Sequence, residues 1–213
     1  MILTSESEAA SKLGLLHKYQ FSKNKSAPLV FLVHGRAGNC DVMWTFRRCI
    51  PEEFSIIAPQ APISDPIGGH SWWPVTEGYS KHQAINAQEL LMNFIISSVD
   101  FYMLEPRLII ALGFSQGGAL LSMLSQSNPA SFSGIAILAG FVIKMDSVIN
   151  TLHKPQIFMA HGLNDEVVPL TKSTDGKLYL EQNGYNVTYV TDNVSHKIGI
   201  QGMKSLKEWI VKI

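Results

Sequence analysis

Charged residues and cysteines are both scarce in this sequence. Asp, Glu, Lys and Arg make up only 16% of its 213 residues, and 17 basic side chains balance 17 acidic ones. A chain without a basic excess gives no electrostatic reason to expect nucleic acid or a polybasic contact with a membrane surface. We therefore expect no nucleic acid partner, and a binding partner that is small or weakly charged.

The two cysteines, Cys40 and Cys49, do not form a CxxC pair and are too few for a zinc site of their own. Nucleotide-binding motifs are missing as well. The sequence has neither the GxGxxG of a dinucleotide site nor the GKS or GKT of a P-loop. We expect two ordinary thiols, no metal and no organic cofactor.

No apolar run approaches the length of a membrane span. The N-terminal stretch MILTSESEAASKLG has acidic residues where a secretory signal would place positive charge. We expect a cytoplasmic protein with no integral membrane contact. Internal repeats and Gly/Ser linkers are absent and 46% of the residues are apolar, so we expect a single domain over residues 1–213. A homodimer is possible, because the sequence does not determine the oligomeric state.

Six short aliphatic or β-branched runs, bounded by Gly or Pro, are the main pattern in the chain. Runs that are apolar on both faces are typical of strands in a parallel sheet covered on both sides. Between them, apolar residues recur at helical spacing. The alternation predicts an α/β sheet with helices on both faces, to which segment 18–33 adds an antiparallel N-terminal strand. The expected strands cover residues 28–35, 54–59, 107–113, 133–140, 155–162 and 185–192, and the helical stripes include Ile85, Leu91, Ile95, Leu120, Leu124, Leu206 and Ile210.

One of these runs leads directly into a glycine-rich serine motif. The stretch IIALGFSQGGALL, residues 109–121, places Ser115 in a GxSxG sequence between an expected strand and an expected helix. Small residues two positions before and after a serine allow a sharp turn that presents its hydroxyl, and the free amides of the following helix favour anions. We interpret Ser115 as a nucleophile. The alternatives are a glycine-rich turn that merely contains serine, or a phosphate cradle.

A serine nucleophile needs a base, and the base needs an orienting acid. In sheets of this kind the three residues follow the chain order Ser, acid, His. His196 fits best, because it follows the last expected strand and precedes the C-terminal helix. His153 and His161 are weaker choices, because the only acid between Ser115 and them is Asp146, which lies at no strand tip.

Asp165 is the expected acid. It lies just beyond the strand expected at 155–162. Functional groups in such sheets gather at the carboxyl ends of the strands, and so we expect this carboxylate near the nucleophile. Asp192 and Glu166 remain rivals, although Asp192 could instead form a local turn.

An acyl-transfer site also needs hydrogen-bond donors for the oxygen that becomes negatively charged. The backbone amide of Gln116, directly after Ser115, is one expected donor, and the amide of Arg36 in the stretch VHGRAGN is the other. The loss of one such donor typically costs about 3 kcal/mol of transition-state stabilisation. Because the backbone provides the donor, the Arg36 side chain is not expected to matter.

Four motifs, in this order and spacing, resemble the phospholipase/carboxylesterase family of α/β hydrolases: HGRAGN, GFSQGG, HGLNDEVVP and SHKI. The resemblance covers nearly the whole chain. It implies an α/β-hydrolase fold that cleaves carboxylic ester or thioester bonds without a metal or cofactor. It also implies Ser115 as nucleophile, Asp165 and His196 as its partners, and Arg36 and Gln116 as the oxyanion donors.

The connection between the strands expected at 133–140 and 155–162 is too short for a lid domain, which predicts an open pocket. The stretch at 60–79 has no regular pattern, and long irregular loops in compact domains are usually functional. Aromatic and apolar side chains near these regions are the expected substrate-binding residues, although a tryptophan here could instead fill the core. They are Trp72, Trp73, Phe114, Phe141 and Val142.

The sequence thus predicts a serine hydrolase that cleaves carboxylic esters of small or acyl-chain substrates through a Ser-His-Asp triad and an acyl-enzyme intermediate. The alternatives are an acyl-protein thioesterase or a lysophospholipase with the same machinery and, more distantly, a non-catalytic binding module. Two differences from the thioesterases favour the ester. Arg36 and Ala37 replace the usual Leu-Gly, and Ser195 precedes the histidine where glycine is common.

Overall fold

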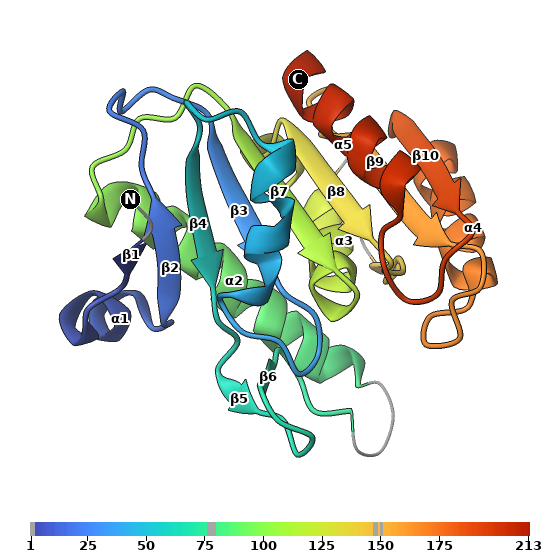
Figure 1. The fold of residues 1–213 in the computed structure, drawn as a ribbon, viewed down its shortest axis with the longest axis horizontal. Helices are drawn as coiled ribbons and strands as arrows, with labels where there is room; N and C mark the ends of the chain where they lie inside the picture. Colours follow the sequence, from blue (N-terminus) through green and yellow to red (C-terminus); the bar gives the residue numbers. More distant parts are fainter. Residues whose placement is uncertain (1–2, 76–79, 147–148, 150) are drawn as a thin grey trace.

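The computed structural model describes residues 3–75, 80–146, 149 and 151–213. Its main sheet has the strands β1 (Leu3–Thr4), β2 (His17–Gln20), β3 (Leu29–Val33), β4 (Ser55–Pro59), β7 (Ile109–Phe114), β8 (Gly134–Leu138), β9 (Gln156–Gly162) and β10 (Val187–Asp192). These eight strands lie in the order β1-β2-β4-β3-β7-β8-β9-β10 (Figure 1). From β4 to β10 every neighbouring pair is parallel, whereas β2 runs antiparallel to both β1 and β4.

All six expected strands are present, and the N-terminal segment forms the expected antiparallel strand, β2. Every residue of β3, β4 and β8 is buried, as expected for strands covered on both faces. The register pairs Val33 with Gly113 and Phe114 with Leu138. The carboxyl ends of β3, β7 and β8 therefore meet at one edge of the sheet.

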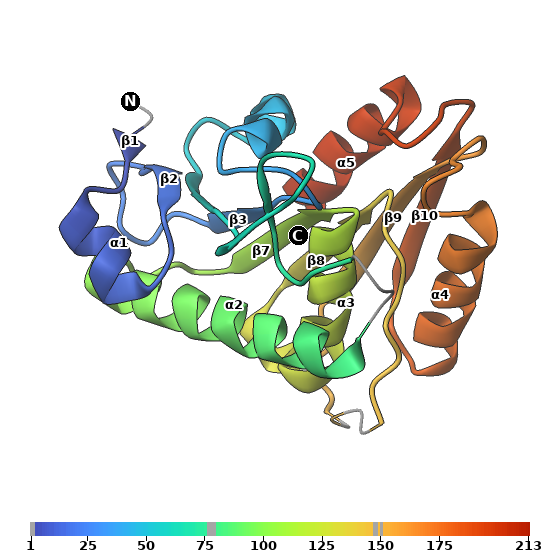
Figure 2. The same ribbon diagram turned by 90° about the horizontal axis from the view of Figure 1, so that it is seen from below.

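Helices cover both faces of the sheet, as expected (Figure 2). The helices are α1 (Ser7–Leu13), the 3-10 helix η1 (Val42–Cys49), α2 (Lys81–Phe101), α3 (Gln116–Ser127), the short 3-10 helix η2 (Pro129–Ser131), α4 (Leu170–Gln182) and α5 (Ile200–Lys212). One face is covered by α2, α3 and α4, and the other by η1 and α5. The helical stripes are buried in these two layers, as Leu91, Leu120 and Leu206 show. Both α1 and η1 are additions that the sequence pattern did not predict.

The stretch at 60–79, which has no regular sequence pattern, contains a small β-hairpin. Its strands are β5 (Ile63–Ser64) and β6 (His70–Ser71), paired antiparallel. Gly68 and Gly69, with φ angles of 101° and 66°, form the turn between the two strands. Strands of two residues are too short to give an alternating pattern, so the expected irregular loop is only partly irregular. Its last residues, 76–79, lie outside the described part of the chain.

The connection from β8 to β9 is short. Residues 139–155 contain no helix or strand among those that the structure describes, which agrees with the expected lack of a lid domain. Of the helices in the described ranges, none is long and apolar enough to cross a membrane.

Candidate active site

Ser115 lies on the sharp turn between β7 and α3. Its φ of 50° is positive, in a region that non-glycine residues rarely adopt, and holding it there costs about 1–3 kcal/mol. Its amide donates to Leu138 O at 2.8 Å, which fixes the turn to β8. Gly113 and Gly117 allow close packing of the backbone at this turn, because neither has a side chain. A Cβ on Gly113 would lie 2.4 Å from Gly117 O, and one on Gly117 would lie 2.3 Å from Val33 O.

The structure brings the Ser115 hydroxyl, the His196 ring and the Asp165 carboxylate into one hydrogen-bonded chain. His196 Nε2 lies 3.1 Å from Ser115 Oγ, and His196 Nδ1 lies 2.7 Å from Asp165 Oδ2. With the ring proton on Nδ1, His196 donates to the carboxylate and accepts from the hydroxyl. Ser115 and Asp165 are buried, and the His196 side chain keeps an exposed fraction of 20%. The three expected side chains are therefore adjacent, while their catalytic roles stay a prediction.

Backbone amides fix the other oxygen of the Asp165 carboxylate. Asp165 Oδ1 accepts hydrogen bonds from the amides of Val167 at 2.9 Å and Val168 at 2.8 Å. Burial of the carboxyl acts to raise its pKa, but the hydrogen bonds from His196 and the two amides outweigh this effect. Together they hold the pKa of Asp165 below its ordinary value. Asp165 is therefore ionised at neutral pH and oriented toward His196.

His161, which the sequence suggested only as a weak candidate base, is a second imidazole at the Asp165 carboxylate. His161 Nε2 lies 2.8 Å from Val168 O and 3.3 Å from Asp165 Oδ2, so this nitrogen carries the proton and donates it. The ring is buried, and its Nδ1 has no hydrogen-bond partner in the described part of the chain. His161 thus helps to hold the Asp165 carboxylate in place. The signal that could have found it is the i, i+4 spacing of the two residues across the end of β9.

The loops after β9 and β10, which carry the acid and the candidate base, are joined by backbone hydrogen bonds. The amides of Leu163 and Asn164 donate to the carbonyl oxygens of Asp192 and Val194, at 2.8 and 3.0 Å. Gly162 permits this approach, because a Cβ there would lie only 2.1 Å from the carbonyl oxygen of the residue before the histidine. The separation of acid and base is therefore set by the backbone.

Neither rival acid takes the place of Asp165. The Asp192 carboxylate accepts from the amides of Gln201 at 3.1 Å and Gly202 at 2.7 Å, and so it caps the N-terminus of α5. Glu166 is exposed to solvent. Within the described residues, the only carboxylate that hydrogen-bonds to the ring of the candidate base is that of Asp165.

The amides of Arg36 and Gln116, the expected oxyanion donors, follow β3 and β7 at the same edge of the sheet. Neither amide donates to another protein group in the part of the chain that the structure describes. The loop after β3 passes close to the serine, since a Cβ on Gly35 would lie 3.1 Å from Ser115 Cβ. The loop that carries the Arg36 amide therefore passes beside the serine, and the role of the two amides as oxyanion donors stays a prediction.

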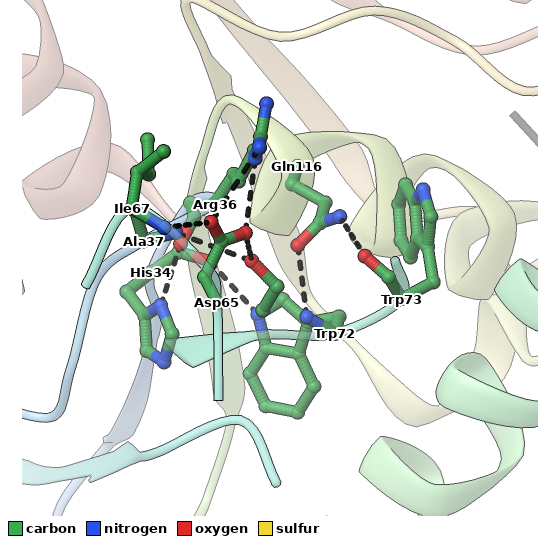
Figure 3. Close-up of polar contacts among 10 residues, drawn as sticks. His34, Arg36, Ala37, Asp65, Ile67, Trp72, Trp73 and Gln116 are labelled. Atoms are coloured by element: carbon green, nitrogen blue, oxygen red, sulfur yellow. Dashed lines mark hydrogen bonds and ion pairs between the residues drawn. The ribbon is translucent and has the colours of Figure 1, made fainter. Parts of the chain in front are cut away.

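The β5–β6 hairpin holds the Arg36 loop through Asp65 (Figure 3). Asp65 Oδ2 accepts from Arg36 Nε at 2.9 Å and from the Ser71 hydroxyl at 2.7 Å, and Ser71 Oγ accepts from the amide of Ala37 at 3.2 Å. The Asp65 side chain is only 2% exposed. Hydrogen bonds from Arg36 and Ser71 lower the pKa of Asp65 to about 2. The Arg36 side chain is therefore anchored, although we did not expect this side chain to matter.

His34 fixes the start of the same loop. Its Nδ1 donates to Gly35 O at 2.7 Å, its Nε2 accepts from the amide of Ala61 at 2.9 Å, and its carbonyl accepts from the Trp72 indole at 2.8 Å. Burial of the ring lowers the pKa of His34 to about 4, so the imidazole is neutral at pH 7. A neutral ring matches these bonds, because Nε2 must be free of its proton to accept.

Trp72 and Trp73, two of the expected substrate-binding residues, are almost wholly buried. Their exposed fractions are 2% and 3%. The amide of Trp72 donates to Gln116 Oε1 at 2.8 Å, and Gln116 Nε2 donates to Trp73 O at 3.0 Å, so the segment anchors the start of α3 (Figure 3). Phe141 and Val142 are half-buried and pack against the same core. Trp72 and Trp73 also line a hollow of about 280 Å³ between the hairpin segment and α2, and their expected contact with substrate stays a prediction.

A cavity of about 450 Å³ lies beside the candidate site, at the layer formed by η1 and α5. It begins at the Arg36 loop and at Phe114, which precedes Ser115. The Phe114 ring contacts the His196 ring, with 5.1 Å between the two centroids. Of the five expected substrate-binding side chains, only that of Phe114 lines this cavity.

The cysteines lie apart from this chemistry. Cys40 and Cys49 are buried free thiols, and burial raises the pKa of both. In the described ranges, no group of three or more His, Cys, Asp or Glu side chains is placed to hold a metal ion.

The motifs and the geometry agree with the comparison with known proteins. The chain matches the Phospholipase/Carboxylesterase family over residues 18–213. It belongs to this family. It is 24% identical to acyl-protein thioesterase 1 of Kluyveromyces lactis, over 90% of this chain and 94% of that protein. It is 26% identical to lysophospholipase-like protein 1 of Mus musculus, over 72% of this chain and 70% of that protein.

Solved structures of this family's fold superpose closely on the chain. The Bacillus cereus carboxylesterase has a TM-score of 0.87 and 22% sequence identity, and the match covers 96% of this chain and 97% of that one. Esterase PE8 has a TM-score of 0.81 and 21% identity over 93% of this chain and 99% of that one. At these identities the likeness establishes the fold, which is the α/β-hydrolase fold that the sequence predicts.

Proposed function

We propose that this protein is a serine esterase, which cleaves carboxylic esters through an acyl-enzyme intermediate. The observation that carries the proposal is the hydrogen-bonded chain from Ser115 Oγ through the His196 ring to the buried Asp165 carboxylate. Membership of the Phospholipase/Carboxylesterase family supports it. The proposed small-molecule partner is accordingly an ester or acyl substrate.

In the first half of the proposed reaction, His196 Nε2 takes the proton of Ser115 Oγ while that oxygen attacks the ester carbonyl. The Asp165 carboxylate keeps the ring proton on Nδ1 and stabilises the imidazolium that forms. His196 then gives its new proton to the leaving alcohol oxygen. The carbon–oxygen bond to the alcohol breaks, and the acyl group remains as an ester of Ser115.

In the second half, water takes the place of the alcohol. His196 Nε2 removes a proton from the water as the water oxygen attacks the acyl carbonyl, and the ring afterwards returns that proton to Ser115 Oγ. The carboxylic acid leaves and the free enzyme is restored. Each half passes through a tetrahedral oxyanion, which the amides of Arg36 and Gln116 stabilise in this proposal.

A thioesterase or lysophospholipase is the second candidate, and the names of the relatives in yeast and mouse favour it. The same steps release a thiol in place of an alcohol. Burial of an acyl chain contributes about 0.8 kcal/mol per methylene, roughly a fourfold gain in kcat/KM for each one that the pocket covers. Parallel chain-length series of oxygen esters and thioesters therefore distinguish the two candidates.

The nucleophile is tested by Ser115→Ala with Ser97→Ala as the matched control, because Ser97 is an exposed serine of α2. We expect Ser115→Ala to abolish both the hydrolysis of 4-nitrophenyl acetate and covalent labelling by a fluorophosphonate, with an unchanged melting temperature and circular dichroism spectrum. Ser97→Ala should retain both. Full activity in a folded Ser115→Ala protein would overturn the proposal and favour a non-catalytic binding module.

A further inference from the structure

The cavity beside the candidate site has an apolar floor and a basic rim. Three basic side chains lie on its wall, from Arg36, Arg48 and Lys197, and none of the described residues that line it is acidic. The whole chain has equal numbers of acidic and basic residues, so this is a local excess of positive charge. The apolar side chains of the floor are Val42, Met43, Phe46, Phe114, Ile198 and Met203.

The cavity lies beside η1 and α5 and is lined by Phe114 and Lys197, the chain neighbours of Ser115 and His196. These two helices contact each other on the same face of the sheet (Figure 2). At the inner end, Phe114 packs against the His196 ring and Arg36 belongs to the proposed oxyanion loop. Lys197 follows the proposed base directly in the chain. Because that base protonates the leaving oxygen, the alcohol part of an ester lies on this side of the serine.

Two of the three basic side chains are available to a ligand. Arg36 is neutralised by its ion pair with Asp65. Arg48 is exposed and donates through Nε and Nη2 to Thr45, which leaves Nη1 and the full positive charge unpaired with any acid in the described structure. The Lys197 ammonium is also exposed, and no group among the described residues hydrogen-bonds to it. The net positive charge of the rim therefore comes from Arg48 and Lys197.

A second hollow, of about 480 Å³, adjoins the first and shares both cations. Arg48, Lys197, Ile198 and Met203 line the two hollows together, and the described lining of the second one contains no acidic residue either. The two cations are exposed and lie where the two hollows adjoin. An apolar body in the cavity would place its far end between them.

We propose that this cavity binds the leaving group of the substrate, and that this leaving group is an apolar alcohol or phenol with an anionic end. The apolar part packs on the floor, and a carboxylate or phosphate at the far end pairs with Arg48 and Lys197. Guanidinium and ammonium groups bind such anions through charge-assisted hydrogen bonds. The inference rests on the proposed esterase function and names the substrate class of that site.

The test compares acetate esters that differ only in the charge of the leaving group. 4-Acetoxybenzoate and 3-(4-acetoxyphenyl)propanoate carry a carboxylate at two distances from the scissile bond, and the corresponding carboxamides are their neutral counterparts. The ratio of kcat/KM for the anionic ester to that for its neutral counterpart isolates the charge effect, because general damage to catalysis cancels. We expect wild-type protein to prefer the anionic esters and to lose this preference as ionic strength rises.

Charge-reversal variants identify which side chains cause the preference for anionic esters. Arg48→Glu and Lys197→Glu should each lower the ratio by roughly tenfold, whereas the matched control Lys204→Glu should leave it unchanged. Lys204 is an exposed residue of α5 outside both hollows, and its replacement makes the same change in net charge. The double variant Arg48→Glu/Lys197→Glu should prefer 4-acetoxyphenyl trimethylammonium over the carboxylates.

The outcomes separate this inference from the proposed function. An unchanged ratio in both variants of an active enzyme would overturn the anionic leaving group and leave the esterase intact. A charge effect seen only with an anion on the acyl side, as in the mono-4-nitrophenyl ester of adipic acid, would overturn the assignment of the cavity to the leaving group. If wild-type protein neither hydrolyses any ester nor reacts with the fluorophosphonate, the proposed function itself fails.

Discussion

Asp65 and Arg36 form an ion pair at the loop that provides one of the two proposed oxyanion donors. Arg36 Nε lies 2.9 Å from Asp65 Oδ2, and Arg36 Nη2 lies 3.5 Å from Asp65 Oδ1. The same carboxylate accepts from the amide of Ile67 at 3.1 Å, within its own hairpin. The position of the Arg36 amide is therefore linked to the fold of the β5–β6 hairpin.

Asp65→Asn should lower kcat with little change in KM. An asparagine side chain can still accept from Ser71, but it has no charge to hold the Arg36 guanidinium, and so the donor amide becomes less ordered. We expect kcat for a neutral ester to fall roughly tenfold, which is part of the hundredfold or more that the loss of a whole donor costs. Steady-state kinetics, normalised to the sites titrated with a fluorophosphonate, measure this change.

The normalisation distinguishes positioning from simple structural damage at Asp65. A purely structural role would lower the melting temperature and the number of titratable sites, while kcat per site stayed at the wild-type value. Asp65→Glu keeps the charge and should recover part of the lost kcat. Equal kcat per site in Asp65→Asn and wild type would show that the ion pair does not position the donor.

The buried His34 should make the protein less stable in mild acid. Its pKa of about 4 in the folded state lies below the ordinary value of 6.5, because burial disfavours the charged ring. Between these values the unfolded chain binds more protons than the folded one. The stabilising contribution is therefore complete above pH 6.5 and is lost as the pH falls toward 4, by about 3 kcal/mol in total.

His34→Gln removes the titrating ring and tests this dependence. We expect the variant to be less stable than wild type at pH 7.5 but to lose roughly 3 kcal/mol less of its free energy of unfolding between pH 7 and pH 4. Urea unfolding at a series of pH values gives both curves. Parallel curves for the two proteins would mean that His34 does not account for the loss.

Asp165→Asn and Asp192→Ala should separate the acid of the triad from its nearest rival. An asparagine amide at position 165 would donate to His196 Nδ1 and force the ring proton onto Nε2, so that the ring could no longer accept from Ser115. We expect kcat/KM to fall by about 10³ to 10⁴. Asp192→Ala removes the cap of α5 and should cost about 1 kcal/mol of stability with at most a severalfold loss of kcat. A comparable loss of activity in both variants would contradict this assignment.

The sheet could be predicted from the sequence because each of its central strands is apolar on both faces. That pattern located β3, β4, β7, β8 and β9, while the β-branched run at 185–192 located the edge strand β10, and the parallel arrangement then placed their tips together. Ser115, Asp165 and His196 lie far apart in the chain but at three such tips, which is why their neighbourhood could be expected. The GxSxG motif further predicted a sharp turn that presents the hydroxyl of Ser115 toward the other two residues.

The surroundings of the site could not be predicted in the same way. Asp65 is one carboxylate in a hairpin whose strands are two residues long, so neither periodicity nor a motif marked it. Trp72 and Trp73 lie in an irregular sequence, and only the packing against the core shows that they are buried. The charged cavity is made by η1 and α5, which are distant in sequence, and its basic residues have no common spacing.

Gly162 should be needed for the approach of the two loops that carry the acid and the base. A Cβ at this position would lie 2.1 Å from Ser195 O and 2.4 Å from Val194 O, both backbone atoms that cannot move aside by a rotamer change. Gly162→Ala must therefore displace the loop that ends in His196. Because His196 Nε2 is already 3.1 Å from Ser115 Oγ, a shift of half an ångström or more takes it beyond an effective hydrogen bond.

We expect Gly162→Ala to lower both kcat and the rate of fluorophosphonate labelling by roughly a hundredfold, since proton transfer by a positioned base contributes about that much or more. Gly184→Ala is the matched control. Its φ of 77° makes alanine unfavourable, but a Cβ there meets only the flexible end of Lys154 at 3.4 Å, in the turn between α4 and β10. It should lower the melting temperature without changing kcat per labelled site. If Gly162→Ala behaves like this control, the backbone contact between the loops does not set the distance from the base to the serine.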